Sequence, residues 1–395
     1  MALGSVGLIC GFLLALMVVI APSAQAQTFT VLYNFTGGSD GGYPYGGLIQ
    51  DANGNLYGTT SAGGASNYGT VFKVTPTGTE TVLYSFAGGS DGKYPYAGVI
   101  LDSEGNVYGT TYQGGASNDG TVFKVNASGG ESVLHSFTGG TTDGCNPGSG
   151  LIFDSQGNLY GDTQLCGASN YGTVFEVTPA GQETVLHSFA AGMTDGAEPF
   201  YGSLLLNNGY LYGVTQHGGT GNGCNLNCGV LFKLSMSGTL TVLHSFANSP
   251  DGSFPFGTPV MDAEGSIYGT TEAGDQDELG IVWKMNRNGT ETILHSFFGG
   301  AEDGAAPEGG VVLDSQGGAA VGGNLYGTSE AGGASGNGIV YKLSKAGELT
   351  ILHSFAGPEG EWPFDSLVRD AQGNLYGTAS GGGSGSSGTV WKLTP

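Results

Sequence analysis

Short runs of β-branched, aromatic and aliphatic residues recur along the chain, and clusters of Gly, Asn, Asp and Ser separate them. One such run is a Leu-Tyr-Gly core, in which Val or Ile replaces Leu in two copies. Its tyrosine recurs at intervals of 51, 52, 52, 56, 58 and 50 residues: Tyr57, Tyr108, Tyr160, Tyr212, Tyr268, Tyr326 and Tyr376. The motifs Gly-Thr-Val-Phe-Lys-Val and Val-Leu-Tyr/His-Ser-Phe recur with it, with variants. The chain is therefore predicted to contain seven copies of one repeat.

Each repeat carries four strand signals, which we name A to D. In the second repeat these are residues 98–101, 106–110, 121–125 and 132–137, and turn-forming residues separate them. No stretch after residue 26 has helical periodicity. Four short antiparallel strands repeated seven times are typical of a β-propeller. We therefore expect an all-β fold, a seven-bladed β-propeller of four-stranded antiparallel blades, as one domain over residues 27–395.

The phase of the repeat predicts how the ring closes. Residues 28–35 form a lone strand D, and the chain ends with strands A, B and C of the seventh repeat. Pairing the first strand with the last three would complete blade 7 and remove the free sheet edges.

The turn between strands C and D suggests a register. A four-residue turn would place Lys73 opposite Glu80, and in the same way Lys124 opposite Glu131 and Lys284 opposite Glu291. Each cross-strand ion pair would contribute ~0.2–1 kcal/mol. In blade 3 the same register would set Glu176 against Glu183.

Charge and the first residues indicate the compartment. The chain has 33 acidic and 10 basic residues and a net charge of −23, which argues against nucleic acid as a partner. Residues 1–26 contain an apolar run and end in Ala-Gln-Ala, which is typical of a signal peptide cleaved after Ala26. No later segment is apolar enough to span a membrane. We expect a secreted or periplasmic monomer.

The cysteines after residue 26 form two pairs. Cys145 precedes strand A of blade 3 and Cys166 follows its strand B, so antiparallel pairing brings both to one end of the blade. Cys224 and Cys228 share one loop of blade 4. Two disulfides, Cys145–Cys166 and Cys224–Cys228, are the favoured interpretation in an exported chain, and zinc binding is the alternative.

The motifs at residues 69–78 and 81–92 resemble the GloVer tandem repeat, which defines the "choice-of-anchor" family of bacterial exported proteins. The resemblance covers residues 28–395. It implies export and a propeller-like array, and it brings no catalytic residues or ligand. Residues 150–160 are also similar to NHL-type and streptogramin-lyase-type propellers, which is a likeness of fold alone.

The D-A and B-C loops should emerge on one face, which we call the loop face. Each D-A loop repeats Asp-Gly-x-x-Pro, with Glu359 in place of Asp in the last copy, and this repetition favours a structural turn. Aromatic residues flank the prolines: Tyr43, Tyr45, Tyr94, Tyr96, Phe200, Tyr201, Phe254, Phe256, Trp362 and Phe364. Aromatic faces beside carboxylates suit sugars or cations, and packing between blades is the alternative. The ligand-binding candidates are Tyr43, Tyr94, Phe200, Phe254, Trp362, Phe364, Glu361 and Asp365, for an extracellular glycan or peptide.

Two further features could carry chemistry. Glu272, Asp275, Asp277 and Glu278 could hold Ca²⁺, although a solvated acidic face is the alternative, and no other cofactor is evident. His217 stands alone in a B-C loop and is a weak candidate for a general base, whereas the other five histidines share one strand D position and are expected to be structural. Three hypotheses follow: a binding module, a lyase or hydrolase with its site on the loop face, and a structural or adhesive surface protein.

Overall fold

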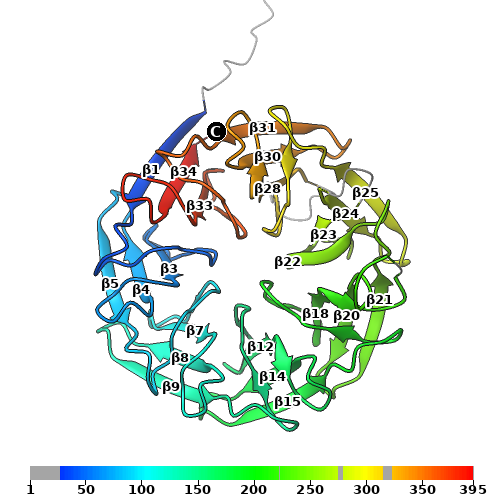
Figure 1. Cartoon of the computed structure of the whole chain (residues 1–395), viewed down its shortest axis with the longest axis horizontal. Helices are drawn as coiled ribbons and strands as arrows, with labels where there is room; N and C mark the ends of the chain where they lie inside the picture. The colour runs from blue at the N-terminus through cyan, green and yellow to red at the C-terminus, as the bar shows by residue number, and fades with distance from the viewer. Residues whose placement is uncertain (1–26, 222, 275–278, 315–322, 395) are drawn as a thin grey trace, which may run out of the picture.

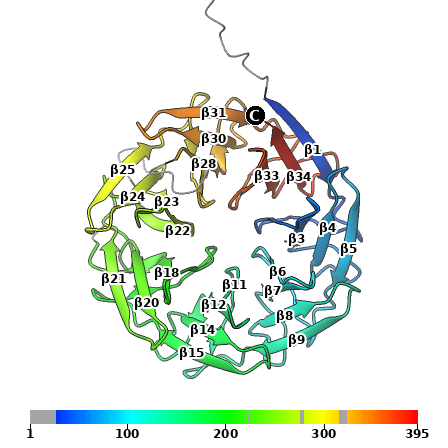
Figure 2. The same cartoon turned by 180° about the vertical axis from the view of Figure 1, so that it is seen from behind.

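The computed structural model shows a ring of seven four-stranded antiparallel sheets (Figure 1). It describes residues 27–221, 223–274, 279–314 and 323–394, and these contain no helix. Within each blade the strands follow the order A to D. In both views β3 (Leu56–Thr60) lies nearer the centre and β5 (Glu80–Ser85) at the outside (Figures 1 and 2). The predicted seven-bladed propeller is confirmed, whereas the predicted signal peptide lies outside the described residues.

The first six blades take their strands in chain order. Blades 1 and 2 consist of β2 (Ile49–Gln50), β3, β4 (Thr70–Val74), β5, β6 (Ile100–Leu101), β7 (Val107–Thr111), β8 (Thr121–Val125) and β9 (Glu131–Ser136). Blades 3 and 4 consist of β11 (Ile152–Phe153), β12 (Leu159–Thr163), β14 (Thr173–Val177), β15 (Glu183–Ser188), β17 (Leu205–Asn207), β18 (Tyr210–Thr215), β20 (Val230–Ser235) and β21 (Leu240–Ser245). Blades 5 and 6 consist of β22 (Ser253–Met261), β23 (Ile267–Ala273), β24 (Ile281–Met285), β25 (Glu291–Ser296), β27 (Val312–Leu313), β28 (Leu325–Ser329), β30 (Ile339–Leu343) and β31 (Leu349–Ser354).

Blade 7 is built from both ends of the chain. It consists of β32 (Val368–Arg369), β33 (Leu375–Ala379), β34 (Thr389–Thr394) and, on the outside, β1 (Thr28–Asn34). Strands β1 and β34 are antiparallel, with Thr28 opposite Thr394 and Asn34 opposite Thr389. Figure 1 shows the blue first strand beside the red last one. The predicted ring closure is confirmed.

Short ladders continue the blades toward the loop face. In blades 3, 4 and 6 a D-A loop pairs with the B-C loop of the same blade, through β10 (Gly144–Cys145) with β13 (Leu165–Cys166), β16 (Gly196–Ala197) with β19 (His217–Gly218), and β26 (Gly304–Ala305) with β29 (Ala331–Gly332). Isolated bridges such as Gly42 to Ala62 and Glu361 to Gly381 do the same in blades 1 and 7. The two loop types therefore form one framework.

Aromatic rings fill the seams between blades. The Phe that follows each strand D packs against the aromatic residue of strand C in the next blade, edge-on in six seams and tilted for Phe246 on Trp283. Phe35, for example, lies edge-on to Phe72 at 5.0 Å. Both rings are fully buried. A Cβ on Gly58 would lie 2.7 Å from the Phe72 ring, so the glycine of the Leu-Tyr-Gly core leaves the space that this ring occupies.

The C-D register differs by one residue from the expected one. Lys73 lies opposite Thr81, and Glu80 lies opposite Val74, because the turn has three residues and Gly78 at its end has a φ of +84°. The predicted Lys-Glu cross-strand pairs are therefore wrong, as is the facing of Glu176 and Glu183. Lys73 lies opposite Tyr57 of strand B, with its Nζ 5.6 Å from the ring centroid, and Lys124 and Lys284 lie over their strand B tyrosines in the same way.

No helix within the described part of the chain is long and apolar enough to cross a membrane.

Candidate functional site

A strained residue begins the loop-face architecture in every blade. The residue before the proline of each D-A loop has a φ between 51° and 58°: Tyr43, Tyr94, Asn146, Glu198, Phe254, Ala306 and Trp362. Its backbone N–H donates to a carbonyl in the B-C loop of the preceding blade, as Tyr43 does to Ser387 at 2.8 Å. This conformation is uncommon for residues other than glycine. Because it recurs in all seven blades with this hydrogen bond, it serves ring assembly, and the side chains remain free to differ.

Four of the predicted ligand-binding residues occupy this strained position, in different blades. Tyr43 and Trp362 are 43% and 46% exposed. Tyr94 packs edge-on against Tyr68, and Phe254 packs edge-on against His217. Glu361 lies beside Trp362, where its backbone pairs with Gly381.

Two residues further along, aromatic side chains of distant blades converge. Tyr201 of blade 4 contacts Tyr96 of blade 2 at 6.3 Å, Phe256 of blade 5 at 5.3 Å and Phe364 of blade 7 at 5.0 Å between ring centroids. Tyr45 of blade 1 completes the set through Tyr96 and Phe364. We call Tyr45, Tyr96, Phe200, Tyr201, Phe256 and Phe364 the central aromatic cluster. It joins five blades across the ring axis.

Blade 4 fills a gap that blade 3 leaves in this cluster. Blade 3 has Gly148 at a position that is aromatic in blades 1, 2, 4, 5 and 7, and blade 4 has two aromatic residues after its proline instead of one. A Cβ on Gly148 would lie 2.2 Å from the Phe200 ring. Phe200 therefore occupies the space above Gly148, and Tyr201 contacts the rest of the cluster.

Polar residues occupy one position of the repeat, three residues after the glycine of the Leu-Tyr-Gly core. This position holds Tyr112, Gln164, Gln216, Glu272 and Glu330 in blades 2 to 6. The Tyr112 hydroxyl donates to Gln164 Oε1 at 2.8 Å, and the Tyr112 ring contacts Tyr96 and Phe200. The sequence did not single out this position, although its variation between blades is visible in the repeat alignment.

Three glutamates, Glu272, Glu308 and Glu330, form an acidic triad on the blade 5 and 6 side. Glu308 occupies the position two residues after the strained residue, which is aromatic in five other blades. It is 8% exposed, and its Oε2 has no hydrogen-bond partner. Burial, the charges of Glu330 and Glu272 and a hydrogen bond with Glu330 raise the pKa of Glu308 to about 9. Burial and the charge of Glu330 also raise the pKa of Glu272. This environment favours a proton on the hydrogen-bonded Glu308-Glu330 pair.

Of the predicted calcium ligands, only Glu272 can be placed. Asp275, Asp277 and Glu278 lie outside the described residues. The prediction of a Ca²⁺ site in this run therefore stays a prediction.

A cavity of about 140 Å³ lies on the axis among the starts of the A strands. Tyr96, Tyr201 and Phe364 of the central aromatic cluster line it together with Asp365. The Asp365 carboxylate accepts hydrogen bonds from the backbone N–H groups of Gly47 and Ser366, and burial raises its pKa. Asp365 thus lines the inner channel and ties blade 7 to blade 1.

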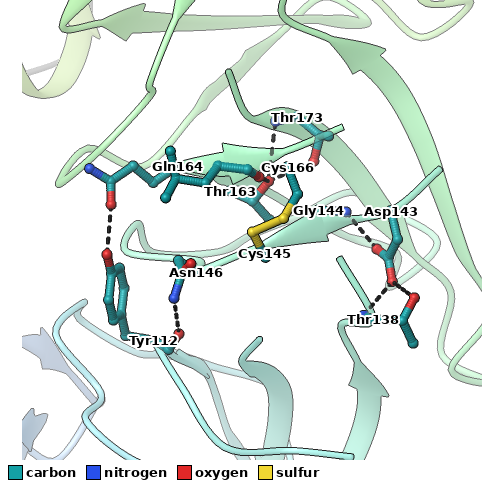
Figure 3. The surroundings of a disulfide bond; sticks show 11 residues. Tyr112, Thr138, Asp143, Gly144, Cys145, Asn146, Thr163, Gln164, Cys166 and Thr173 are labelled. Atoms are coloured by element: carbon teal, nitrogen blue, oxygen red, sulfur yellow. Dashed lines mark hydrogen bonds between the residues drawn. A yellow bond between two sulfur atoms is a disulfide. The ribbon is translucent and has the colours of Figure 1, made fainter. Parts of the chain in front are cut away.

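Both predicted disulfides are present. Cys145–Cys166 joins β10 to β13, and Cys224–Cys228 closes a turn in the B-C loop of blade 4. Figure 3 shows the Cys145–Cys166 bond with Asn146 and Gln164 on the side that faces Tyr112. Asn146, which follows Cys145, donates to the backbone carbonyl of Tyr112 at 3.0 Å, and Gln164, two residues before Cys166, accepts from the Tyr112 hydroxyl. This disulfide therefore holds the two loops that present Gln164 to Tyr112.

His217 lies away from the central aromatic cluster. Its Nε2 is 3.8 Å from Glu198 Oε2, and its ring packs against Phe254. The arrangement is a His-carboxylate pair at the seam between blades 4 and 5.

The sequence matches the profile of the Gloeobacter/Verrucomicrobia repeat in three overlapping segments, residues 18–226, 102–322 and 223–395. No curated protein sequence matches the chain.

Among solved structures, the extracellular domain of a proposed hybrid two-component system from B. thetaiotaomicron is similar at a TM-score of 0.56 and 12% identity, over 92% of this chain and 39% of that chain. A proposed 6-phosphogluconolactonase from Bacteroides fragilis is similar at 0.50 and 17% identity, over 82% and 87%. A gluconolactonase from Xanthomonas campestris follows at 0.43 and 14% identity, over 93% and 89%. At these identities the likeness is one of fold.

Proposed function

The chain belongs to the Gloeobacter/Verrucomicrobia repeat family, and we propose that this member is an exported binding module that holds a glycan at the centre of its loop face. One observation carries the proposal. The central aromatic cluster lies beside hydrogen-bonding side chains of neighbouring blades, among them Tyr112, Gln164 and the acidic triad.

The chemistry of this centre suits a sugar. Aromatic rings pack against the apolar C–H faces of a pyranose, while amide and carboxyl groups bind its hydroxyls. The protonated form of Glu308, which its raised pKa favours, can donate as well as accept hydrogen bonds. A peptide is the alternative ligand, for which the same aromatic rings would take apolar side chains.

Export is part of the proposal. Two disulfides in one chain are typical of oxidising compartments outside the cytoplasm. Together with the signal-peptide pattern of residues 1–26, they favour a secreted or periplasmic protein.

A glycan array on the purified protein tests the proposal, followed by affinity measurements on each hit. Gln164→Ala and Glu330→Gln should each weaken binding, roughly two- to tenfold, because the first removes a hydrogen-bonding side chain and the second replaces an acceptor oxygen with an amide donor. The matched controls are Gln156→Ala, in an exposed A-B turn of blade 3, and Glu264→Gln, in an exposed A-B turn of blade 5. Equal affinity of all four variants would contradict a site at this centre.

A second candidate function rests on the same triad. A carboxylic acid that stays protonated beside another carboxyl group is typical of a general acid, so a lyase or hydrolase is the runner-up. Product formation from an array hit, abolished by Glu308→Gln, would favour the enzyme. An array with no hit would favour a structural or adhesive protein.

A further inference from the structure

A second kind of polar cluster repeats at the outer edge of the ring, between neighbouring blades. It combines the Tyr or His of strand D, the acidic residue that precedes a glycine in the following D-A loop, and a residue in the first two positions of strand D of the next blade. In the first copy the Tyr33 hydroxyl donates to Asp40 at 3.0 Å, and Glu80 of the next blade lies close enough to raise the pKa of Tyr33. We call each such set a seam triad.

The seven seam triads differ in composition. Two have tyrosine, two have histidine with leucine, one has histidine with phenylalanine, and two combine histidine with both carboxylates. In chain order they are Tyr33-Asp40-Glu80, Tyr84-Asp91-Glu131, His135-Asp143-Glu183, His187-Asp195-Leu240, His244-Asp251-Glu291, His295-Asp303-Leu349 and His353-Glu359-Phe29.

In the two complete triads the ligating atoms converge. His135, Asp143 and Glu183 each bring one N or O atom within 4.8 Å of the others, and His244, Asp251 and Glu291 do the same. His135 Nε2 lies 3.4 Å from Asp143 Oδ2. His244 Nε2 lies 3.2 Å from Asp251 Oδ1 and 3.9 Å from Glu291 Oε2.

Several of these atoms lack a partner. Glu183 Oε1 and Glu291 Oε1 are buried without a hydrogen bond, as are the same atoms of Glu80 and Glu131 in the tyrosine triads, and His135 Nε2 has only its 3.4 Å contact with Asp143. A buried polar atom without a partner is costly. The aspartates, in contrast, are held in place: Asp143 accepts from Thr138 and from the backbone N–H of Gly144, and Asp251 accepts from the backbone N–H of Ala247.

We propose that the His135-Asp143-Glu183 and His244-Asp251-Glu291 triads each bind a divalent transition-metal ion such as Zn²⁺, clamping blade 2 to blade 3 and blade 4 to blade 5. One imidazole nitrogen and two carboxylate oxygens form a common ligand set for such ions, and three protein ligands leave a position for water. Ligands held roughly 2.0–2.2 Å from a tetrahedral Zn²⁺ lie about 3.3–3.6 Å from one another. The His-Asp separations of 3.4 and 3.2 Å are close to this range, and the glutamate oxygens lie within 4.8 Å of the other ligand atoms, so small side-chain movements would complete each site.

A metal ion would also neutralise the negative charge of the two carboxylates in each triad. Without one, burial and the charge of Asp143 raise the pKa of Glu183 to about 7, and burial, a hydrogen bond and the charge of Asp251 raise that of Glu291 to about 9. A proton shared by the carboxylates is thus the alternative occupant. The backbone donors to Asp143 and Asp251 would orient these ligands toward the ion.

The other seams supply matched controls within the same chain. His187 and His295 bind Asp195 and Asp303 at 3.0 and 3.1 Å, but leucine replaces the glutamate. The Tyr84-Asp91-Glu131 triad has both carboxylates and no imidazole. Leucine at the glutamate position and tyrosine at the histidine position are therefore compatible with the fold.

Calorimetric titration of the chelator-treated protein with Zn²⁺ tests the proposal. We expect two ions to bind per chain. Glu183→Leu and Glu291→Leu should each remove one ion, and so should His135→Tyr and His244→Tyr, which copy native seams. Glu131→Leu should keep both ions. Bound Zn²⁺ should also raise the unfolding temperature of the unmodified protein.

The opposite result is equally definite. No saturable Zn²⁺ binding, or two ions that persist in the Glu183→Leu/Glu291→Leu double variant, would overturn the proposal and leave a shared proton between the carboxylates. Unfolding temperatures of the metal-free variants show whether each one is folded, and the His→Tyr pair repeats the test through a different ligand.

Discussion

At the scale of single residues, one substitution in a repeat is compensated in the next repeat. Blade 3 has Gly148 at a position that is aromatic in five other blades, and blade 4 has an additional aromatic residue that fills the resulting space. Phe200 lies against Gly148 and Tyr112, while Tyr201 reaches the axis. The shape of the loop-face centre thus depends on contacts between residues 52 positions apart in the sequence.

Gly148→Ala should lower the free energy of unfolding by ~1–3 kcal/mol, because its Cβ would overlap the Phe200 ring. Urea denaturation measures the loss. Gly89→Ala, where the nearest atom to a new Cβ is 3.9 Å away, should change it by less than ~0.5 kcal/mol. The double variant Gly148→Ala/Phe200→Ala should lose less unfolding free energy than the two single variants lose together. Full additivity would show that the two residues do not interact.

At the scale of elements, hairpin geometry decides which side chains face each other. The C-D hairpin has a three-residue turn, so the pairings next to the turn move by one residue from the four-residue expectation, and beyond the bulge between Val71 and Phe72 they move by two. Lys73 therefore does not face Glu80. It lies opposite Tyr57 across the B-C ladder, and Glu80 takes part in its seam triad.

Removal of β1 should destabilise the whole ring, since it exposes the edge of β34 and the seam rings around Trp391. A chain that begins at Phe35 should unfold at a much lower temperature and be cleaved faster by protease. A peptide of residues 27–35 should restore much of the loss. The same peptide with Phe29→Asp should not, because Phe29 stacks on His353 at 3.7 Å. Unchanged melting of the shortened chain would contradict closure by β1.

At the scale of the whole molecule, the repeat multiplies the same ionisable environments. Burial and a neighbouring aspartate raise the pKa values of Glu80 and Glu131 to about 7, as in Glu183. The A-B turn aspartates have lowered pKa values because backbone and Asn side-chain donors bind the charged form: Asp51, Asp102, Asp154 and Asp370. The stability that the glutamates contribute therefore decreases as the pH rises, whereas the stability that the turn aspartates contribute decreases as the pH falls.

The unfolding temperature should be highest near pH 5 in metal-free buffer and should fall as the pH rises to 9. The raised glutamates keep their protons in the folded chain above the pH at which the unfolded chain loses them. Their contribution is therefore lost progressively as the pH rises from about 4.5, the ordinary pKa, to the folded-state pKa values of about 7 to 9. Below about pH 4 the turn aspartates become protonated and stability falls again. Glu131→Gln should flatten the decline above pH 5, while the exposed Glu302→Gln should not. A rise in stability between pH 5 and 8 would contradict these assignments.

Much of the architecture could be read from the sequence because it is encoded locally and repeated. The spacing of the Leu-Tyr-Gly cores determined the number of blades, turn residues marked the four strands, and the phase of the first and last strands predicted closure. The Cys145–Cys166 pair followed from antiparallel pairing within one blade. Each inference needed only residues of one repeat, or a count of repeats.

The tertiary structure alone decided which loops meet. Tyr45, Tyr201 and Phe364 lie in repeats far apart in the sequence, and only the curvature of the closed ring brings them to one axis. His135 and Glu183 begin to interact only when two blades pack side by side, after the three-residue turn has set the register. Periodicity determines what each blade is, whereas the angle between blades determines which of their side chains share a site.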